Sequence, residues 1–114
     1  MADRPAGGAV SSPTQRSLKH LRDKGCVAQV VEHWQAFAKI RIDLFGIIDI
    51  VALSPEGETI GVQATDLSSV SKRVQKIADA AALAALRRCG WRILVHGWGK
   101  DAKGRYRLRE VDCS

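Results

Sequence analysis

A hairpin of two strands constrains this chain more than any other sequence feature. Residues 45–53 (FGIIDIVAL) form a strongly β-branched run that predicts a largely buried strand, and residues 59–65 (TIGVQAT) predict the strand that returns beside it. The intervening residues 55–57 fit a three-residue loop, in which proline supplies a fixed φ and glycine takes the left-handed position. The length of this loop decides which residues of the two strands face each other.

The predicted register places a carboxylate and an amide side by side. With a three-residue loop Asp49 faces Gln63 directly, whereas a four-residue loop would separate them. The other face of the hairpin is apolar and should pack on the core; its residues are Ile48, Ile50, Ala52, Ile60, Val62 and Ala64. A buried, unpaired carboxylate is unfavourable, so Asp49 indicates a functional site. The alternatives are that Asp49 forms a salt bridge with Lys39 or Arg41, and that Gln63 only satisfies its hydrogen bonds.

Helices and further strands are predicted on both sides of the hairpin. Two helices are expected over residues 12–25 and 68–89, and three strands over residues 26–34, 91–98 and 106–111, while residues 35–44 are ambiguous. The buried stripe of the second helix is Val70, Val74, Ile77, Ala81 and Ala84. This αβββαβ order with an added edge strand predicts an α/β fold, with a mixed central sheet flanked by helices and a right-handed crossover between parallel strands.

Length and composition limit the class of protein. A chain of 114 residues is expected to form one domain over residues 12–114, preceded by a disordered tail at residues 1–11. The chain shows no long apolar run and no secretory signal, which favours a cytoplasmic protein without a membrane contact. Its three cysteines and three histidines lack metal-ligand spacing, so neither a zinc enzyme nor a disulfide framework is expected.

The net charge of +6 is unevenly distributed along the chain. Residues 72–109 carry 11 basic and two acidic side chains, whereas residues 1–71 carry seven basic and eight acidic ones. This asymmetry favours a polyanionic partner, most simply DNA, and the alternative is a solvated basic face without a partner. The candidate contacts to phosphates and bases are Arg73, Trp98, Lys100, Lys103, Arg105, Arg107 and Arg109. Trp34 and Trp91 are expected in the core, and His96 is either a general base or a packed residue.

The sequence Gly46-Ile47-Ile48-Asp49, the hairpin, Gln63-Ala64-Thr65 and the basic helix that follows resemble the core of the PD-(D/E)XK nuclease superfamily. The resemblance covers about residues 12–111 and is greatest to small phage and bacterial nucleases of the Holliday-junction-resolvase-like and VRR-NUC-like types. It implies a restriction-endonuclease-like core, and magnesium-dependent cleavage of DNA in a bacterial or phage-infected cytoplasm, with manganese as a substitute ion.

The resemblance assigns roles to individual residues. It implies that Asp49 and Gln63 hold the metal ion, together with the backbone carbonyl of Ala64, and oxygen ligands of this kind suit Mg²⁺. The motif lysine corresponds to Thr65, which carries no charge, so Lys72 or Lys76 of the following helix is expected to supply it. A further carboxylate is needed, and Glu32 on the first strand is favoured over Asp23 near the end of the first helix, with Asp43 as the third candidate.

Three functions remain open from the sequence. The first is a metal-dependent DNA endonuclease, with selectivity for DNA structure as an option. The second is a nucleic-acid-binding protein with a degenerate nuclease fold, which the Thr65 position favours. The third is a protein-interaction or accessory module. A homodimer is compatible with the first two, because Leu83 and Leu86 lie off the main stripe of the long helix; the alternative is burial of both sides within one protomer.

Overall fold

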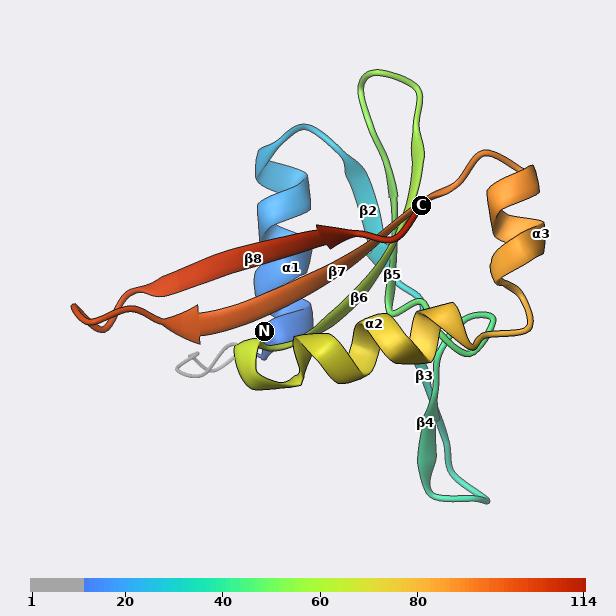
Figure 1. Ribbon diagram of the computed structural model, residues 1–114, viewed down its shortest axis with the longest axis horizontal. Coiled ribbons are helices and arrows are strands. Elements are labelled where there is room, and N and C mark those ends of the chain that lie inside the picture. Colours follow the sequence, from blue (N-terminus) through green and yellow to red (C-terminus); the bar gives the residue numbers. More distant parts are fainter. Residues whose placement is uncertain (1–11) are drawn as a thin grey trace, which may run out of the picture.

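A mixed five-stranded sheet organises the protein, as the computed structural model in Figure 1 shows. Its strand order is β2-β5-β6-β7-β8, in which β6 and β7 are parallel and the other neighbours are antiparallel. The strands of the sheet are β2 (Val27–Val30), β5 (Ile50–Leu53), β6 (Thr59–Asp66), β7 (Arg92–Lys100) and β8 (Tyr106–Asp112). The structure describes residues 12–114, so the predicted tail at residues 1–11 lies outside the described residues. The predicted α/β class with a mixed sheet is confirmed.

The predicted hairpin register is confirmed. Ile50 lies opposite Val62 and Leu53 opposite Thr59, which is the pairing that a three-residue loop imposes. Gly57 closes the loop with a φ of +91°, a conformation that favours glycine. Regular pairing begins only at Ile50, however, because residues 44–48 form a tight turn in place of the predicted start of the strand.

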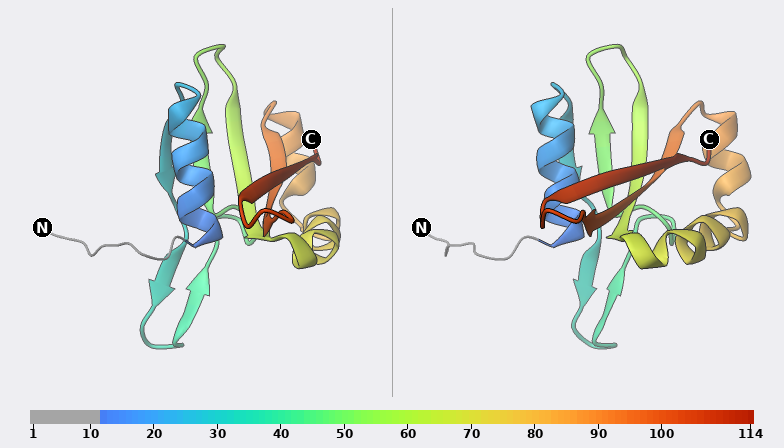
Figure 2. Two further views of the ribbon diagram at one scale, coloured as in Figure 1. Left: turned by 90° about the vertical axis from the view of Figure 1, so that its left-hand side faces the viewer. Right: turned by 60° about the vertical axis from the view of Figure 1, so that its left-hand side comes forward.

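Helices cover both faces of the sheet (Figure 2). Helix α1 (Pro13–Asp23) packs Leu18 and Leu21 on one face, against a cluster that includes Ile50, Val62 and Leu94. The other face is covered by α2 (Val70–Ala78) and α3 (Leu83–Arg88), which follow a short 3₁₀ turn, η1 (Leu67–Ser69). The expectation that Ile48 shares a face with Ile50 is wrong. Because Ile48 precedes the paired strand, its side chain lies on the α2 face, over Gly61.

The predicted long helix is two helices. The chain leaves the helical path between Ala78 and Leu83, although the segment contains neither glycine nor proline. The break lets Leu83 and Leu86 join Ile77 in the core of this face, so Ala81 and Ala84 of the predicted stripe are exposed. Since both leucines are buried within the protomer, the apolar surface that suggested a homodimer is absent from the described residues.

A second hairpin projects from one end of the sheet (Figure 1). It consists of β3 (His33–Gln35) and β4 (Ile40–Ile42), so it divides the predicted strand 26–34 and fills the ambiguous segment. Trp34 belongs to this hairpin and is 56% exposed, which contradicts its predicted place in the core. None of the described helices is both long enough and apolar enough to cross a membrane.

Candidate metal centre

A cavity of about 620 Å³ opens at the end of the sheet where β5 begins and β6 ends. Its walls come from the first turn of α1, the base of the β3–β4 hairpin and the inner side of α2. The strand ends supply Asp49, Ala64 and Thr65, and the hairpin supplies Glu32, Arg41 and Asp43. Segments far apart in the sequence therefore meet at one polar pocket.

Three carboxylates converge in this cavity. Glu32, Asp43 and Asp49 each offer an oxygen within 4.8 Å of the other two. The convergence follows from the local fold. The β2–β5 pairing ends at the Val30–Ile50 pair, and beyond this pair the segment after Val30 and the segment before Ile50 both lead to the projecting hairpin. The backbone carbonyl of Asp49 accepts hydrogen bonds from the N–H groups of Val31 and Glu32, at 2.8 and 3.3 Å, which fixes Glu32 beside Asp49.

Two of the three sequence-based candidates for a second carboxylate, Glu32 and Asp43, are thus adjacent to Asp49, whereas Asp23 pairs with Lys19 at 2.6 Å on α1. The alternative role for Asp49, a salt bridge to Arg41 or Lys39, is absent from the described ion pairs. Arg41 lies instead 3.9 Å from Glu32. Oxygen ligands grouped in this way fit a hard divalent cation such as Mg²⁺ or Mn²⁺.

Asp49 is the most buried carboxylate of the group, with 4% of its surface exposed. Burial, reinforced by the adjacent Asp43, raises the pKa of Asp49 to about 7, against the hydrogen bond of 2.9 Å that Asp49 Oδ2 accepts from the Ala64 N–H. Burial also opposes ionisation of Asp43, but hydrogen bonds with Asp49, Gln63 and Lys76 lower its pKa overall. A bound cation would favour ionisation of both groups.

Gln63 connects the carboxylates to cationic side chains. Its Nε2 donates to the Ile47 carbonyl at 2.7 Å and lies 3.2 Å from both Asp43 Oδ2 and Asp49 Oδ1. Its Oε1 accepts from Arg73 Nη1 at 2.6 Å and from Lys76 Nζ at 3.4 Å. Acceptors on one side and cations on the other determine this orientation of the amide. The oxygen that the resemblance assigned to a metal ion therefore faces the cations, and the amide nitrogen faces the carboxylates.

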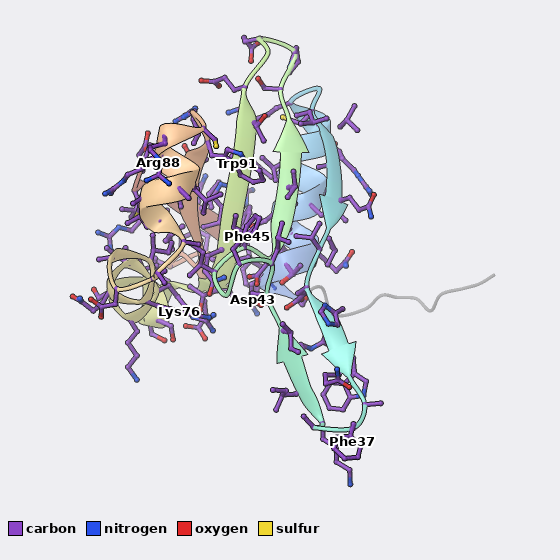
Figure 3. The ribbon with its side chains drawn as sticks, turned by 90° about the vertical axis from the view of Figure 1, so that its right-hand side faces the viewer. Phe37, Asp43, Phe45, Lys76, Arg88 and Trp91 are labelled. Atoms are coloured by element: carbon purple, nitrogen blue, oxygen red, sulfur yellow. The ribbon has the colours of Figure 1, made fainter. Side chains whose placement is uncertain are left out.

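Only one of the two candidate lysines lies at the cavity. Lys76 lines it, with Nζ 3.1 Å from Asp43 Oδ2, and Figure 3 shows both residues where α2 approaches the base of the hairpin. Lys72 is exposed and is not among the residues that line the cavity. Thr65, at the motif-lysine position, is buried in the cavity wall. Positive charge at this site therefore comes from Arg73 and Lys76 of α2, and from Arg41 of the β3–β4 hairpin.

The start of α1 forms another part of the wall. Residues 12–15 line the cavity, and Ser12 caps the helix by accepting a hydrogen bond of 3.1 Å from the Gln15 N–H. Pro13 has no N–H and the N–H groups of Gln15 and Arg16 are bonded to Ser12, so the Thr14 N–H and the helix dipole are what favour an anion at this end. The sequence predicted that Ser12 caps this helix, but not that the cap lies at the cavity. The distance between the cap and the cavity depends on how α1 packs across the sheet.

The remaining candidate nucleic-acid contacts follow the β7–β8 edge of the sheet. Thr65, Gly97 and Arg109 are successive neighbours across three strands, so Arg109 lies about 10 Å from the cavity wall at the usual strand spacing. Arg107 contacts Asp101 at 2.8 Å. The other cations of this edge, which are exposed, are Lys100, Lys103 and Arg105.

Trp98 and His96 lie on the α1 face, in a separate network. Trp98 Nε1 donates to Ser17 Oγ at 2.8 Å, and His96 lies 2.9 Å from both Ser17 Oγ and Glu110 Oε2. Burial lowers the pKa of His96. Because Ser17 and His96 are fully buried, His96 is a packed residue that joins α1 to the sheet.

The cavity thus combines ligands for a hard cation with groups that favour a bound anion. The carboxylates share its lining with Arg41, Arg73, Lys76 and the start of α1. No protein-family model, characterised protein or solved structure matches the chain. Its function is therefore inferred from the chemistry of this cavity.

Proposed function

We propose that this protein is a metal-dependent nuclease that hydrolyses DNA phosphodiesters at the Glu32–Asp43–Asp49 cluster. The observation that carries the proposal is the convergence of these three carboxylates, within 4.8 Å, in a cavity that Arg41, Arg73 and Lys76 also line. Phosphodiester hydrolysis needs both parts, since a divalent cation polarises the phosphate and lowers the pKa of an attacking water. Mg²⁺ is the proposed ion, with Mn²⁺ as a substitute.

Each part of the cavity has a role in this proposal. The carboxylates hold the cation, and Gln63 positions two of them through its amide nitrogen. Lys76 and Arg73 bind the non-bridging oxygens of the scissile phosphate, which supplies the charge that Thr65 lacks. The start of α1 favours a neighbouring phosphate through the Thr14 N–H and the helix dipole. The basic β7–β8 edge contacts the DNA backbone farther along without reading sequence.

The element order supports the finer assignment of a restriction-endonuclease-like fold. Helix α1 precedes the antiparallel strands β2, β5 and β6, and a helical crossover leads to the parallel strand β7. This is the αβββαβ order that the resemblance to the PD-(D/E)XK superfamily implies, and the β3–β4 hairpin is an insertion into it. Three free cysteines suit the reducing cytoplasm that the proposal assigns.

Cleavage assays on supercoiled, linear and branched DNA with Mg²⁺ or Mn²⁺ test the proposal. Asp49→Asn should lower cleavage at least about a hundredfold, because loss of a metal ligand exceeds the usual effect of losing a supporting residue. Glu56→Gln is the matched control, since it removes a carboxylate from the exposed loop between β5 and β6. Metal-dependent cleavage that survives Asp49→Asn would rule out this site.

A second candidate function is DNA binding without cleavage. The specific observation in its favour is that Lys76 and Arg73 are engaged by Asp43 and Gln63, so they are not free to bind a scissile phosphate. Salt-sensitive binding to DNA without cleavage in either metal ion would support this function. A lack of DNA affinity would support a protein-interaction or accessory module instead.

A further inference from the structure

The β3–β4 hairpin carries aromatic side chains in solvent. Phe37 is 97% exposed at the tip, where Figure 3 shows it at the end of the molecule, and Trp34 is 56% exposed. Ile40 adds a third exposed apolar side chain. A surface of this kind usually has a binding partner, because burial of large apolar side chains is favourable.

The charge of the hairpin identifies the kind of partner. Residues 33–42 contain Lys39 and Arg41 and no carboxylate. Trp34 lies directly opposite Arg41 in the register, so the ring and the guanidinium share one face of the hairpin. Arg41 also lines the cavity, which makes this aromatic and cationic surface continuous with the candidate metal centre. A polyanion with flat apolar groups, which is a nucleic acid with accessible bases, complements such a surface.

The length of the hairpin sets where those bases would lie. Phe37 lies five positions after Glu32 in the sequence, so the tip stands about 17 Å from the carboxylates at the usual rise of an extended chain. This length corresponds to about five nucleotides at 3.4 Å each. In a continuous duplex, the base faces at that distance are stacked on each other and are closed to an aromatic ring.

We propose that the β3–β4 hairpin is a wedge that stacks Phe37 and Trp34 on unpaired bases, and that the substrate is DNA with a branch point or a single-stranded gap. This inference rests on the proposed nuclease function. Aromatic rings stack on every base without sequence preference. Apolar side chains that project from a protein can also insert between neighbouring base pairs where base stacking is weak. The expected cut lies a few nucleotides from the branch.

Binding experiments with a fluorescently labelled three-way junction and a duplex of equal length, both in EDTA, test the wedge. Phe37→Ala should weaken junction binding about tenfold or more, which is within the range for losing one stacked base, and duplex binding less than about twofold. Phe37→Trp should retain the preference, whereas Phe37→Leu should lose it, because leucine keeps apolar surface but no ring. Leu53→Ala, which removes an exposed side chain from β5, is the control and should change neither affinity.

The outcomes separate the wedge from the nuclease. If Phe37→Ala abolishes junction preference but no DNA is cut with Mg²⁺ or Mn²⁺, the nuclease proposal fails and the wedge stands. If DNA is cut but Phe37→Ala leaves junction affinity unchanged, or lowers both affinities equally, the wedge is overturned. A dimer in sedimentation that Phe37→Ala converts to a monomer, with junction affinity unchanged, would also overturn the wedge and assign the hairpin to a second copy of the chain.

Discussion

Replacing Asp49 with asparagine should stabilise the metal-free protein at alkaline pH. Burial, reinforced by Asp43, raises the pKa of Asp49 from its ordinary value of 3.8 to about 7. Below pH 4 the group is protonated in the folded and unfolded states, so it has little effect. Between pH 4 and 7 it ionises only in the unfolded state, so stability falls as pH rises, and above pH 7 the loss is complete.

The size of the effect follows from that pKa difference. At about 1.4 kcal/mol per pKa unit, ionised Asp49 lowers the free energy of unfolding by about 4 kcal/mol above pH 7. Asparagine can still accept the hydrogen bond from the Ala64 N–H, but it loses the one from Gln63 Nε2, which is worth about 1 kcal/mol. The expected gain for Asp49→Asn is therefore about 3 kcal/mol at pH 8 and less than about 1 kcal/mol at pH 5.

Urea denaturation in EDTA at both pH values measures this gain. Glu56→Gln provides the control and should change the free energy of unfolding by less than about 0.5 kcal/mol at either pH. Added Mg²⁺ should stabilise the wild type, by about 2.7 kcal/mol at 100 times the dissociation constant, and leave Asp49→Asn unaffected. A variant that is less stable than the wild type at pH 8, or a gain that is equal at both pH values, would refute the reasoning.

Three other predictions, based on five substitutions, probe the site and the fold. Lys76→Met should lower DNA cleavage at least about tenfold whereas Lys72→Met should not, because only Lys76 lines the cavity, and kinetics on one duplex would compare them; equal losses would contradict this. Ser17→Ala should lower the free energy of unfolding by about 2–3 kcal/mol in urea, since Trp98 and His96 lose a buried partner; an unchanged midpoint would contradict it. Gly97→Ala should destabilise more than Gly61→Ala in thermal denaturation, because the new Cβ would lie 2.2 Å from Val70 Cγ2 in the first case and 2.7 Å from the flexible end of Ile48 in the second; the reverse order would contradict it.

Local signals made the hairpin and the centre of the site predictable. A proline and a glycine in the β5–β6 loop fixed its length, and the period of two then placed Asp49 beside Gln63. The parallel crossover to β7 followed from a helix between two strands, a connection with few alternatives. Glu32, on the first predicted strand, and Asp43 were two of three candidates for a further carboxylate, and both lie beside Asp49.

The features that the sequence did not predict depend on packing. The break before α3 contains no glycine or proline, and it forms because Leu83 and Leu86 reach the core only if the helix turns. The β3–β4 hairpin has no strong turn signature, since residues 36–39 are Ala-Phe-Ala-Lys. The orientation of Gln63 depends on Arg73 and Lys76, whose positions relative to β6 follow from the placement of α2. Such contacts between distant segments leave no local pattern in the sequence.

An anomalous difference map from crystals grown with Mn²⁺ tests the central claim most directly. The account predicts one strong peak within coordination distance of carboxylate oxygens from Glu32, Asp43 and Asp49, with Gln63 still donating its amide nitrogen to the cluster. The same crystals of Asp49→Asn should lose the peak. A wild-type map without a peak at these three side chains, or with its only peak elsewhere, would contradict the account.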